Sequence, residues 1–395
     1  MRHELDGNAL TMKICFVLGT RPEIIKLSPI IRECERVGLD YFIVHTGQHY
    51  SYRMDRVFFE ELDLPPSRYN LDVGSGSHAQ QTGKMLIGIE SVLQNENPDI
   101  VLVEGDTNTV LAGALAAVKL GLKVGHVEAG LRSHDREMPE EINRILADHC
   151  SDLLFAPTKA SRDTLLREGV PRDKIFVTGN TIVDAVFQNL ELAKNRTHDL
   201  QNLKIQKDSY FLATVHRQEN VDNKNRFERI LKGLNLLIKK YGIPVVYPIH
   251  PRARKQLETF DLDPKEVRTT DPVTYLTFLN LESNSRLVLT DSGGVQEETC
   301  ILKVPCVTLR DNTERPETLE VRSNVLAGTD PHSIVDKADI MLKRKRDWNN
   351  PFGDGNAGKS IAHIIMDRYE TDLIKRSRKE KQRLSGNQLR GKQKP

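Results

Sequence analysis

The feature that most constrains this chain is a regular alternation of short apolar runs with longer segments of helical periodicity. Residues 22–37, 77–95 and 107–120 repeat apolar positions every three or four residues, and short apolar runs separate them. The run at residues 100–103 reads Ile-Val-Leu-Val without a polar break. A strand with one solvent-facing side alternates apolar and polar residues, whereas a strand covered on both faces is apolar throughout. The pattern therefore predicts parallel sheets with helices on both faces, which is the doubly wound α/β fold.

The alternation occurs twice along the chain. In the first half we expect strands at residues 13–19, 41–46, 99–104, 123–128, 153–156 and 175–178. In the second half we expect them at 210–215, 245–249, 287–290 and 306–309. A polar stretch over 190–209 separates the two series. Single cores stop growing near roughly 250–300 residues, so the 395 residues of the chain favour two domains.

The sequence predicts two Rossmann-like domains with flanking segments. We expect an N-terminal extension at 1–12, a first domain at 13–195 and a second domain at 196–345. A C-terminal helix at 346–372 is expected to pack back on the first domain, and a basic tail at 373–395 to lack fixed structure. In open α/β sheets, ligands bind at the carboxyl ends of the strands, so two facing domains would place their sites in one cleft.

Charge and composition narrow the function classes. The net charge is +2, but the last 21 residues hold nine Lys and Arg against one Glu, so the body is slightly acidic. An acidic body is not typical of a nucleic-acid-binding protein. No apolar run approaches the ~18 residues of a membrane span, and no signal peptide is recognisable. The five cysteines show no CxxC spacing. We therefore expect a cytoplasmic enzyme with reduced cysteines, without membrane or nucleic-acid partners.

Polar residues follow the first expected strand. Gly19, Thr20 and Arg21 precede Pro22, which suits the first position of a helix. Arg21 would then lie at a helix N-terminus, where a phosphate is readily bound, and Lys26 lies one turn further along.

Three carboxylates are expected to converge in the first domain. Asp106 follows the strand at 99–104, where it also fits the cap of the next helix. Glu128 closes an apolar strand, and burying a carboxylate without a partner is costly. Glu140 stands in a first helical turn, where acidic residues are common because of the helix dipole. Crowded carboxylates raise one another's pKa, so one can stay protonated while another is ionised. The set indicates proton-transfer chemistry.

The second domain offers an anion site. His216 and Arg217 end its first strand, and Ser292, Gly293 and Gly294 follow the strand at 287–290. Glycines let backbone N–H groups approach a pyrophosphate at a helix N-terminus, and Glu298 could accept from two ribose hydroxyls. The alternative is a glycine-rich turn capped by Ser292.

Other motifs give no further site. Residues 353–360 match the P-loop pattern, but no apolar strand precedes them, so we interpret them as a helix start. No G-x-G-x-x-G follows the first strand and the histidines have no metal-ligand spacing, so neither a cofactor nor a metal is expected.

From about residue 13 to 365, the chain resembles the non-hydrolysing UDP-N-acetylglucosamine 2-epimerases, which have the two-domain GT-B architecture. The motifs that carry the resemblance are Gly19-Thr20-Arg21-Pro22-Glu23, Gly105-Asp106-Thr107, Val127-Glu128-Ala129-Gly130, Pro139-Glu140-Glu141 with Asn143-Arg144, His216-Arg217, Thr290 to Glu298, and Thr313-Glu314-Arg315-Pro316-Glu317.

The resemblance implies a UDP-sugar substrate and a homodimer. It implies that UDP is held by Arg21, Lys26, His216, Phe278, Ser292, Gly293, Gly294, Glu298 and Arg315. It implies that Asp106, Glu128, Glu140 and His216 are the catalytic residues, with Asp106 and Glu128 also in contact with the sugar. Gln48 and His49 resemble part of a regulatory site for a second UDP-sugar, but residues 71–79 do not match its remainder.

The C2 hydrogen of a UDP-sugar is not acidic, because no carbonyl adjoins it. The family reaction therefore eliminates UDP to form 2-acetamidoglucal and then adds UDP back, with a proton delivered to the other face. Four alternatives stay open on the residues: a hydrolysing epimerase, an epimerase of a modified diacetamido sugar, a GT-B glycosyltransferase, and an inactive nucleotide-sugar sensor. The segment between Leu131 and Pro139, shorter than in the common bacterial enzymes, keeps the modified sugar open.

Overall fold

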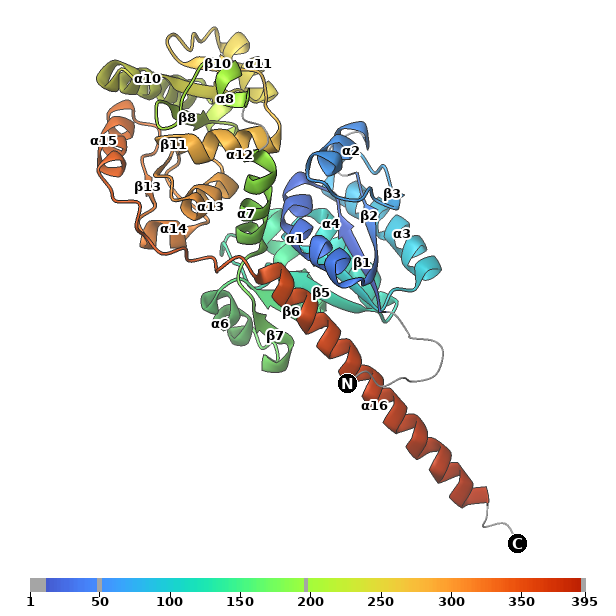
Figure 1. Cartoon of the computed structure of the whole chain (residues 1–395). Coiled ribbons are helices and arrows are strands. Elements are labelled where there is room, and N and C mark those ends of the chain that lie inside the picture. Colours follow the sequence, from blue (N-terminus) through green and yellow to red (C-terminus); the bar gives the residue numbers. More distant parts are fainter. Residues whose placement is uncertain (1–11, 48–51, 195–197, 392–395) are drawn as a thin grey trace. The chain divides into compact units, whose positions relative to one another are not determined.

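The structure is a computed structural model that describes residues 12–47, 52–194 and 198–391. The chain divides into two compact units (Figure 1). Unit 1 comprises the described residues up to Glu60, Leu64–Thr181 and those from Asn356 onward. Unit 2 comprises Glu61–Asp63 and Ile182–Gly355.

Unit 1 is built on a seven-stranded sheet in which every pair is parallel. Its strands are β1 (Lys13–Leu18), β2 (Asp40–His45), β3 (Tyr69–Asn70), β4 (Ile100–Glu104), β5 (Lys123–Val127), β6 (Leu153–Ala156) and β7 (Ile175–Val177). Its helices are α1 (Arg21–Val37), α2 (Tyr52–Glu61), α3 (His78–Glu96), α4 (Asn108–Lys119), α5 (Pro139–Cys150), α6 (Lys159–Arg167), the short 3₁₀ helix η1 (Arg172–Lys174) and α16 (Ala357–Gly391).

The apolar runs of unit 1 are buried on both faces. Successive side chains of a strand point to opposite faces, so Cys15 and Val17 pack with α3 and α4 while Phe16 faces the other side. All three side chains are fully buried. The expectation of a parallel sheet covered on both faces is confirmed.

Unit 2 is a second parallel sheet, of six strands. Its strands are β8 (Phe211–Thr214), β9 (Val245–Pro248), β10 (Arg268–Thr270), β11 (Leu287–Thr290), β12 (Cys306–Thr308) and β13 (Asn324–Leu326). Its helices are α7 (Thr181–Lys194), α8 (His198–Asn202), α9 (Gln218–Val221), α10 (Lys224–Tyr241), α11 (Pro251–Phe260), α12 (Tyr275–Asn284), α13 (Gly293–Leu302), α14 (Pro316–Glu320) and α15 (Pro331–Leu342). One core cluster joins Phe211 to Phe227 of α10, and another joins Leu212 to Leu281 of α12.

Both sheets have a point where the strand order reverses. The order is β3-β2-β1-β4-β5-β6-β7 in unit 1 and β10-β9-β8-β11-β12-β13 in unit 2. The reversals fall between β1 and β4 and between β8 and β11. The loops that leave neighbouring strands diverge at such a point, and ligands of doubly wound sheets bind there. The loops after these four strands are therefore the first place to look for a site.

The division of the chain differs from the expected one. It falls at Thr181–Ile182 rather than at 195–196, so nearly all of α7 belongs to unit 2. The polar stretch that suggested the later boundary includes α8, which packs against α12 through Leu200 and Leu203. Polar composition here marks a surface helix of unit 2. The strands β3, β10 and β13 were not expected, because their residues, Tyr-Asn, Arg-Thr-Thr and Asn-Val-Leu, do not form a run of apolar residues.

The C-terminal helix α16 lies in unit 1 against α1. A side chain at Gly358 would meet the backbone of Pro29 at 2.9 Å, so this glycine serves close helix packing. No strand precedes it at residues 343–356, so the P-loop match is a helix start, as expected. The helix continues to Gly391, which contradicts the expectation of an unstructured tail from 373. Before Pro395 the segment lacks proline and is rich in Lys, Arg, Gln and Leu, which favour helix.

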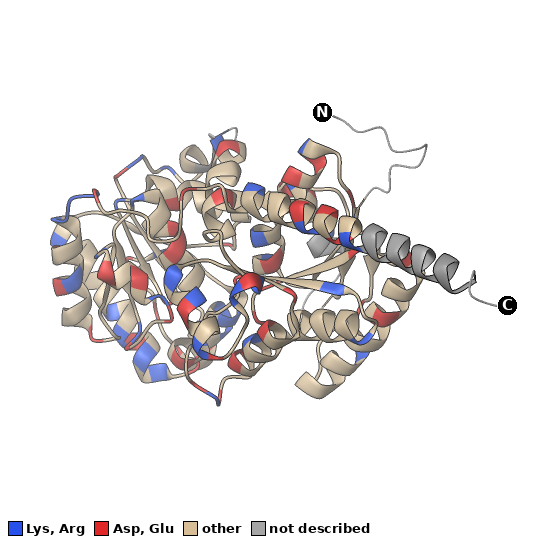
Figure 2. Ribbon diagram, turned by 90° about the horizontal axis from the view of Figure 1, so that it is seen from below, with Lys and Arg blue, Asp and Glu red and all other residues tan. Residues whose placement is uncertain are grey.

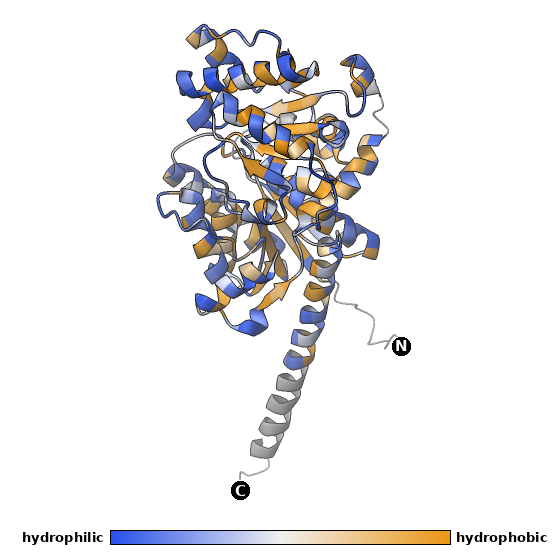
Figure 3. Cartoon of the chain, turned by 90° about the vertical axis from the view of Figure 1, so that its left-hand side faces the viewer, coloured by the Kyte–Doolittle hydropathy of each residue, from blue (hydrophilic) through white to orange (hydrophobic). Residues whose placement is uncertain are grey.

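Figure 3 shows that the strands are mostly hydrophobic, whereas hydrophilic and hydrophobic residues alternate along the helices. Acidic and basic residues are interspersed over the helices of both units (Figure 2). Within the described part of the chain, no helix has the length and apolar character needed to cross a membrane.

Candidate active site

The two loops at the switch point of unit 1 are tied together by Glu23. Its buried carboxylate accepts from the N–H of Gly19 at 2.5 Å and of Thr20 at 3.0 Å, and from the hydroxyl of Thr107. Burial raises the pKa of Glu23 to about 7, although these hydrogen bonds oppose the change. Glu23 therefore joins the loop after β1 to the loop after β4 and titrates near neutral pH.

Arg21 begins α1 beside this junction. Its side chain is exposed, and its guanidinium lies 5.5 Å from the ring centre of Phe58. A cation at a helix N-terminus adds its charge to the N–H groups and the positive end of the helix dipole. This position suits a phosphate, and the role of Arg21 as a phosphate ligand stays a prediction.

Glu128 lies in a strained turn directly after β5. Its φ of 69° is in the left-handed region, which a residue with a Cβ adopts rarely. Its carboxylate contacts the Lys26 ammonium and accepts from the Asn180 amide at 3.2 Å. The unusual backbone conformation and the two defined partners hold the Glu128 carboxylate in one position.

The Lys26 ammonium is shared with a second carboxylate, Glu104, whose Oε1 lies 3.3 Å away. Glu104 closes β4 and is fully buried. Burial raises the pKa of Glu104 well above its usual range; Lys26 opposes this, while Glu128 adds to it. One ammonium therefore faces two carboxylates, and the arrangement favours a proton on Glu104.

Asp106 does not cap α4. That position is taken by Thr107, whose hydroxyl accepts from the N–H of Thr109 at 3.2 Å, so the expectation of a cap at Asp106 is wrong. Because the cap is one residue later, the Asp106 carboxylate is left to pair with Arg144 of α5. The Asn143 amide also donates to the Asp106 backbone carbonyl at 2.9 Å.

The two glutamates at the start of α5 differ. Glu141 is buried, accepts from Ser133 and His134 at 2.9–3.0 Å, and pairs with Arg144 at 2.9 Å. Glu140 is partly exposed and forms no hydrogen bond or ion pair within residues 12–47, 52–194 and 198–375. Arg144 comes four positions after Glu140, so both side chains lie on one face of α5. Glu141 therefore holds the preceding loop, whereas the carboxylate of Glu140 is available.

A buried ionic network lies beneath these turns. His126 places Nδ1 2.7 Å from Asp148 and Nε2 2.9 Å from the Gly105 carbonyl. Burial would lower the pKa of His126, but Asp148 and the Gly105 carbonyl reverse this and raise it. Arg132 pairs with the same Asp148 at 2.7 Å and with Glu168 at 2.6 Å. The network fixes the backbone next to Asp106.

In unit 2, the buried carboxylate of Asp291 joins two loops, as that of Glu23 does in unit 1. Its carboxylate accepts from the backbone N–H of His216 at 3.1 Å and of Arg217 at 3.0 Å, and from the Asn220 amide at 3.0 Å. Asp291 follows β11 and His216 follows β8, so the carboxylate joins the loops on both sides of the switch point. The imidazole of His216 is partly exposed and its ring centre lies 6.1 Å from that of His250.

The N-terminus of α13 is open. Ser292 is the N-cap but its side chain does not cap the helix, so the alternative of a turn capped by this serine is not supported. A Cβ at Gly293 or Gly294 would meet nothing closer than 3.8 Å. A ten-residue helix whose N-terminus has no side-chain cap and begins with two glycines suits an anion.

The arginines after β12 are paired with carboxylates. Arg310 contacts Glu219 and Glu314, each at 2.8 Å. Burial opposes ionisation of Glu314, but Arg310 outweighs it and lowers the pKa of Glu314 to about 2. Arg315 places Nε 2.7 Å from Glu297. The predicted phosphate ligand Arg315 is thus held by a carboxylate of α13.

Glu298 lies 6% exposed on α13 and accepts from the Tyr275 hydroxyl at 3.0 Å. Tyr275 begins α12, and Phe278 follows it one turn later, partly buried against the core. The predicted ribose and uracil ligands therefore lie on adjacent helices of one unit.

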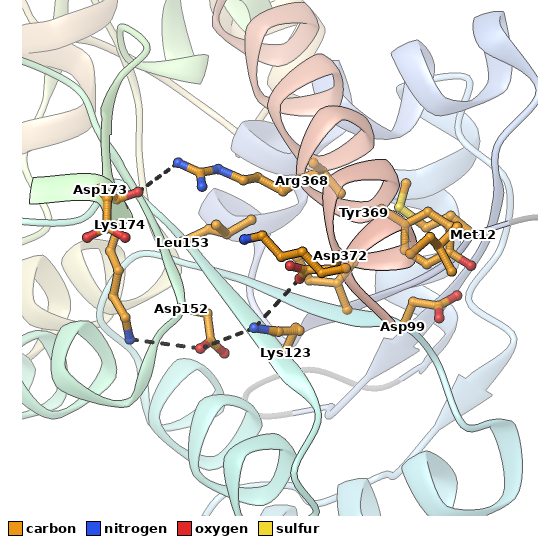
Figure 4. Close-up of a pocket in the computed structure, with 14 residues that line it drawn as sticks. Met12, Asp99, Lys123, Asp152, Leu153, Asp173, Lys174, Arg368, Tyr369 and Asp372 are labelled. Atoms are coloured by element: carbon orange, nitrogen blue, oxygen red, sulfur yellow. Dashed lines mark hydrogen bonds and ion pairs between the residues drawn. The ribbon is translucent and has the colours of Figure 1, made fainter. Parts of the chain in front are cut away.

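A pocket of about 240 Å³ lies elsewhere in unit 1, lined by α16 and the amino ends of its strands. Figure 4 shows Lys123 between Asp152 and Asp372, each 3.9 Å away, and Arg368 donating to the Asp173 carbonyl. The residues after β1, β4 and β5 lie at the opposite ends of these strands. The pocket is therefore remote from the carboxylates described above.

Comparison with known proteins bears on both units. The family model described as UDP-N-acetylglucosamine 2-epimerase matches residues 32–366. The chain belongs to this family. The UDP-N-acetylglucosamine 2-epimerase of Methanocaldococcus jannaschii is 56% identical over 361 residues, covering 90% of this chain and 99% of that protein. Its crystal structure with UDP-GlcNAc and UDP superposes with a TM-score of 0.82 over 90% of this chain and 99% of that one. A UDP-2,3-diacetamido-2,3-dideoxy-D-glucuronate 2-epimerase of Pseudomonas aeruginosa is 45% identical, covering 90% of this chain and 99% of that protein.

Within this epimerase-family fold, every residue predicted to be catalytic or to bind UDP lies in the described part. The structure groups Lys26 with Glu128, and the Tyr275 helix with Glu298. Sequence reasoning missed four residues: Glu23, Glu104, Arg144 and Asp291. The signal for Glu104 was present, since it closes an apolar strand just as Glu128 does. Gln48 and His49, named for a regulatory site, lie outside the described residues.

Proposed function

We propose that this chain interconverts UDP-N-acetylglucosamine and UDP-N-acetylmannosamine by non-hydrolysing epimerisation at C2. The observation that carries the proposal is the Lys26, Glu104 and Glu128 cluster beside the Asp106–Arg144 pair. Carboxylates in unequal environments provide a proton acceptor and a proton donor in one place.

The proposed reaction is elimination followed by addition. A carboxylate takes the C2 proton, the C2–H electrons form the C1=C2 bond, and the C1–O electrons leave with UDP. The product is 2-acetamidoglucal. In the return step a carboxylic acid delivers a proton to the other face of C2, and a phosphate oxygen of UDP attacks C1. No cofactor is needed, because no electrons leave the substrate–UDP pair.

We assign the proton transfers to Asp106, Glu128 and Glu140. Glu128 pairs with the Lys26 ammonium and suits a base, and Glu140 has an available carboxylate. Lys26, which the family resemblance assigns to UDP, is assigned here to the charge balance of Glu104 and Glu128. The strained turn at Glu128 holds its carboxylate in place, which general acid–base catalysis requires.

We assign the departing diphosphate to Arg21, His216 and the N–H groups at Ser292, Gly293 and Gly294. Preorganised donors stabilise charge where it develops, so they favour cleavage of the C1–O bond. Phe278 would contact the uracil and Glu298 the ribose. Arg315 would reach UDP with its Nε held by Glu297. We further propose that the protein is a homodimer, which sedimentation of the purified protein tests.

The deciding experiment incubates the protein with UDP-N-acetylglucosamine in D₂O and follows the proton spectrum. We expect UDP-N-acetylmannosamine with deuterium at C2 and no free UDP. Free UDP with N-acetylmannosamine would indicate a hydrolysing enzyme instead.

A second candidate substrate is a UDP-diacetamido uronic acid, because a relative of that name is 45% identical over 90% of this chain. The 56% identity to a UDP-N-acetylglucosamine 2-epimerase favours the first candidate. Parallel incubation of both UDP-sugars at equal concentration compares them directly. Faster deuterium incorporation into the diacetamido sugar would reverse the assignment.

A further inference from the structure

The face of α12 that packs on α13 carries Tyr275 and Glu282, which both lie near Glu298 of α13. The Tyr275 hydroxyl donates to Glu298 Oε1 at 3.0 Å. Glu282 lies seven residues further along α12, which is close to two helical turns, so it shares the face of Tyr275. The carboxylate of Glu298 lies close enough to Glu282 to raise the pKa of Glu282. Glu282 is 0% exposed and Glu298 is 6% exposed.

Two buried carboxylates can hydrogen-bond only if one keeps a proton. Neither oxygen of Glu282 meets a donor among the described residues, so an ionised Glu282 would be buried without any hydrogen bond. Burial raises the pKa of Glu282 well above its usual range, and the neighbouring Glu298 adds to this. A proton on Glu282 removes the cost of burying it without a hydrogen bond, because its O–H can then donate to the Glu298 carboxylate.

The consequence is that donors of α12 fix the carboxylate of Glu298. Tyr275 and Glu282 would both donate to it from one helix face, which restricts its rotation. The proposed function requires Glu298 to accept from two ribose hydroxyls at once, and this works only in a narrow range of orientations. If the carboxylate rotated freely, ordering it on binding would cost conformational entropy and so weaken the affinity for the ribose.

We propose that Glu282 is a positioning residue for the nucleoside, holding the Glu298 carboxylate by a hydrogen bond in the orientation that accepts the two ribose hydroxyls. The inference rests on the proposed function, since it takes UDP as the nucleotide and Glu298 as its ribose ligand. A purely structural Glu282 would affect the stability of the fold without changing how the protein distinguishes ribose from deoxyribose.

The test measures binding of UDP and 2′-deoxy-UDP by calorimetry to the wild type, Glu282→Gln and Glu282→Met. We expect the wild type to bind UDP about 10-fold more tightly, since the deoxy nucleotide leaves part of Glu298 without a donor. In Glu282→Met, the affinity for UDP should fall about 10-fold and that for 2′-deoxy-UDP should change little, so the preference disappears. Glu282→Gln can still donate through its amide and should keep the preference.

Folding is checked by thermal melting. Methionine is close to glutamate in size but removes a donor to the buried Glu298 carboxylate, so we expect a lower melting temperature with the variant still folded at the temperature of the calorimetry. Glu282→Leu serves as a second apolar variant. An undiminished preference for UDP in a folded apolar variant overturns the inference, and so does a wild type that binds both nucleotides equally.

The outcome for the proposed function is separate. A wild type that epimerises in D₂O and binds UDP, while Glu282→Met keeps its preference, rejects only the role of Glu282. A wild type that does not bind UDP rejects the proposed function and this inference together.

Discussion

At the switch point of each sheet, one buried carboxylate ties together the two loops that flank it. In unit 1, Glu23 accepts from the loop after β1 and from Thr107 after β4. In unit 2, Asp291 after β11 accepts from His216 and Arg217 after β8. In both sheets, therefore, a buried carboxylate accepts hydrogen bonds across the switch point and holds the two diverging loops together.

The surroundings of these carboxylates differ. Around Glu23 the neighbouring groups are mostly acidic, with Glu104, Glu128 and Asp106 balanced by Lys26 and Arg144. Around Asp291 the neighbouring groups are donors: backbone N–H groups, the His216 ring and the open N-terminus of α13. Under the proposed function, the carboxylates at the switch point of unit 1 transfer protons, and the donors at the switch point of unit 2 hold the diphosphate.

The largest effect expected from this contrast is in turnover. Glu128→Gln should lower kcat by about 10²–10⁴-fold, because the amide cannot exchange a proton at C2. UDP affinity should change little, since the proposed diphosphate donors are Arg21 and groups of unit 2. The measurements are deuterium incorporation for kcat and calorimetry for UDP.

The matched control is Glu137→Gln, an exposed glutamate in the loop before α5. Its turnover should equal that of the wild type. Near-normal turnover in both Glu128→Gln and Glu140→Gln would contradict the assignment of unit 1 to proton transfer.

The next effect is on stability, through Glu23. Its pKa is raised from 4.5 to about 7, so its contribution is full below pH 4.5 and is lost as the pH rises through about 7. The difference corresponds to about 3 kcal/mol. Relative to Glu23→Gln, the wild type should therefore lose about 3 kcal/mol of unfolding free energy between pH 4.5 and 7.5, measured by urea unfolding.

Glu33→Gln on the same helix is the control of opposite sign. Hydrogen bonds from Arg36 lower the pKa of Glu33, so its contribution is present above the ordinary glutamate pKa and is lost on acidification. If Glu23→Gln and the wild type changed in parallel with pH, the raised pKa of Glu23 would be wrong.

The contrast between the two switch points also explains how much of the site could be predicted from the sequence. Continuous apolar strands predicted both sheets, and polar residues after strands predicted Arg21, Asp106, Glu128, His216 and the Ser292 turn. These are local signals, because a strand end and the loop that follows are adjacent in sequence.

The partners of these residues could not be predicted. Lys26 was assigned to UDP, yet its ammonium contacts Glu128 and Glu104, which are 102 and 78 residues away. Arg144 pairs with Asp106 across 38 residues. Such pairs depend on the packing of α1 and α5 against the strand ends, and a single sequence does not encode that packing in a readable pattern. The helix beyond residue 372 was missed for another reason: its charged composition was interpreted as disorder, although its residues favour helix.

A smaller effect tests the parallel role of Asp291. Asp291→Asn keeps the size of the side chain but replaces one acceptor oxygen with an amide. Either the N–H of Arg217 then loses its acceptor, or the amide donor of the new side chain faces the N–H of His216. We expect about 10-fold weaker UDP binding by calorimetry, because an unsatisfied buried donor costs about 1–3 kcal/mol. Asp311→Asn, an exposed aspartate paired with Arg226, is the control and should bind UDP as the wild type does. Unchanged affinity in Asp291→Asn would show that the two switch points are not held in the same way.

The smallest effect is expected at the amino ends of the unit 1 strands. Lys123 lines the pocket under α16, with a 51% exposed side chain and two carboxylates at 3.9 Å (Figure 4). Exposed ion pairs contribute about 0–1 kcal/mol. Lys123→Met should therefore change the unfolding free energy by no more than about 1 kcal/mol and leave kcat unchanged, as should Lys84→Met on the exposed side of α3. A tenfold loss of turnover in Lys123→Met alone would mean that the amino ends of the strands influence the carboxylates at the carboxyl ends. The two ends of this sheet would then not act independently.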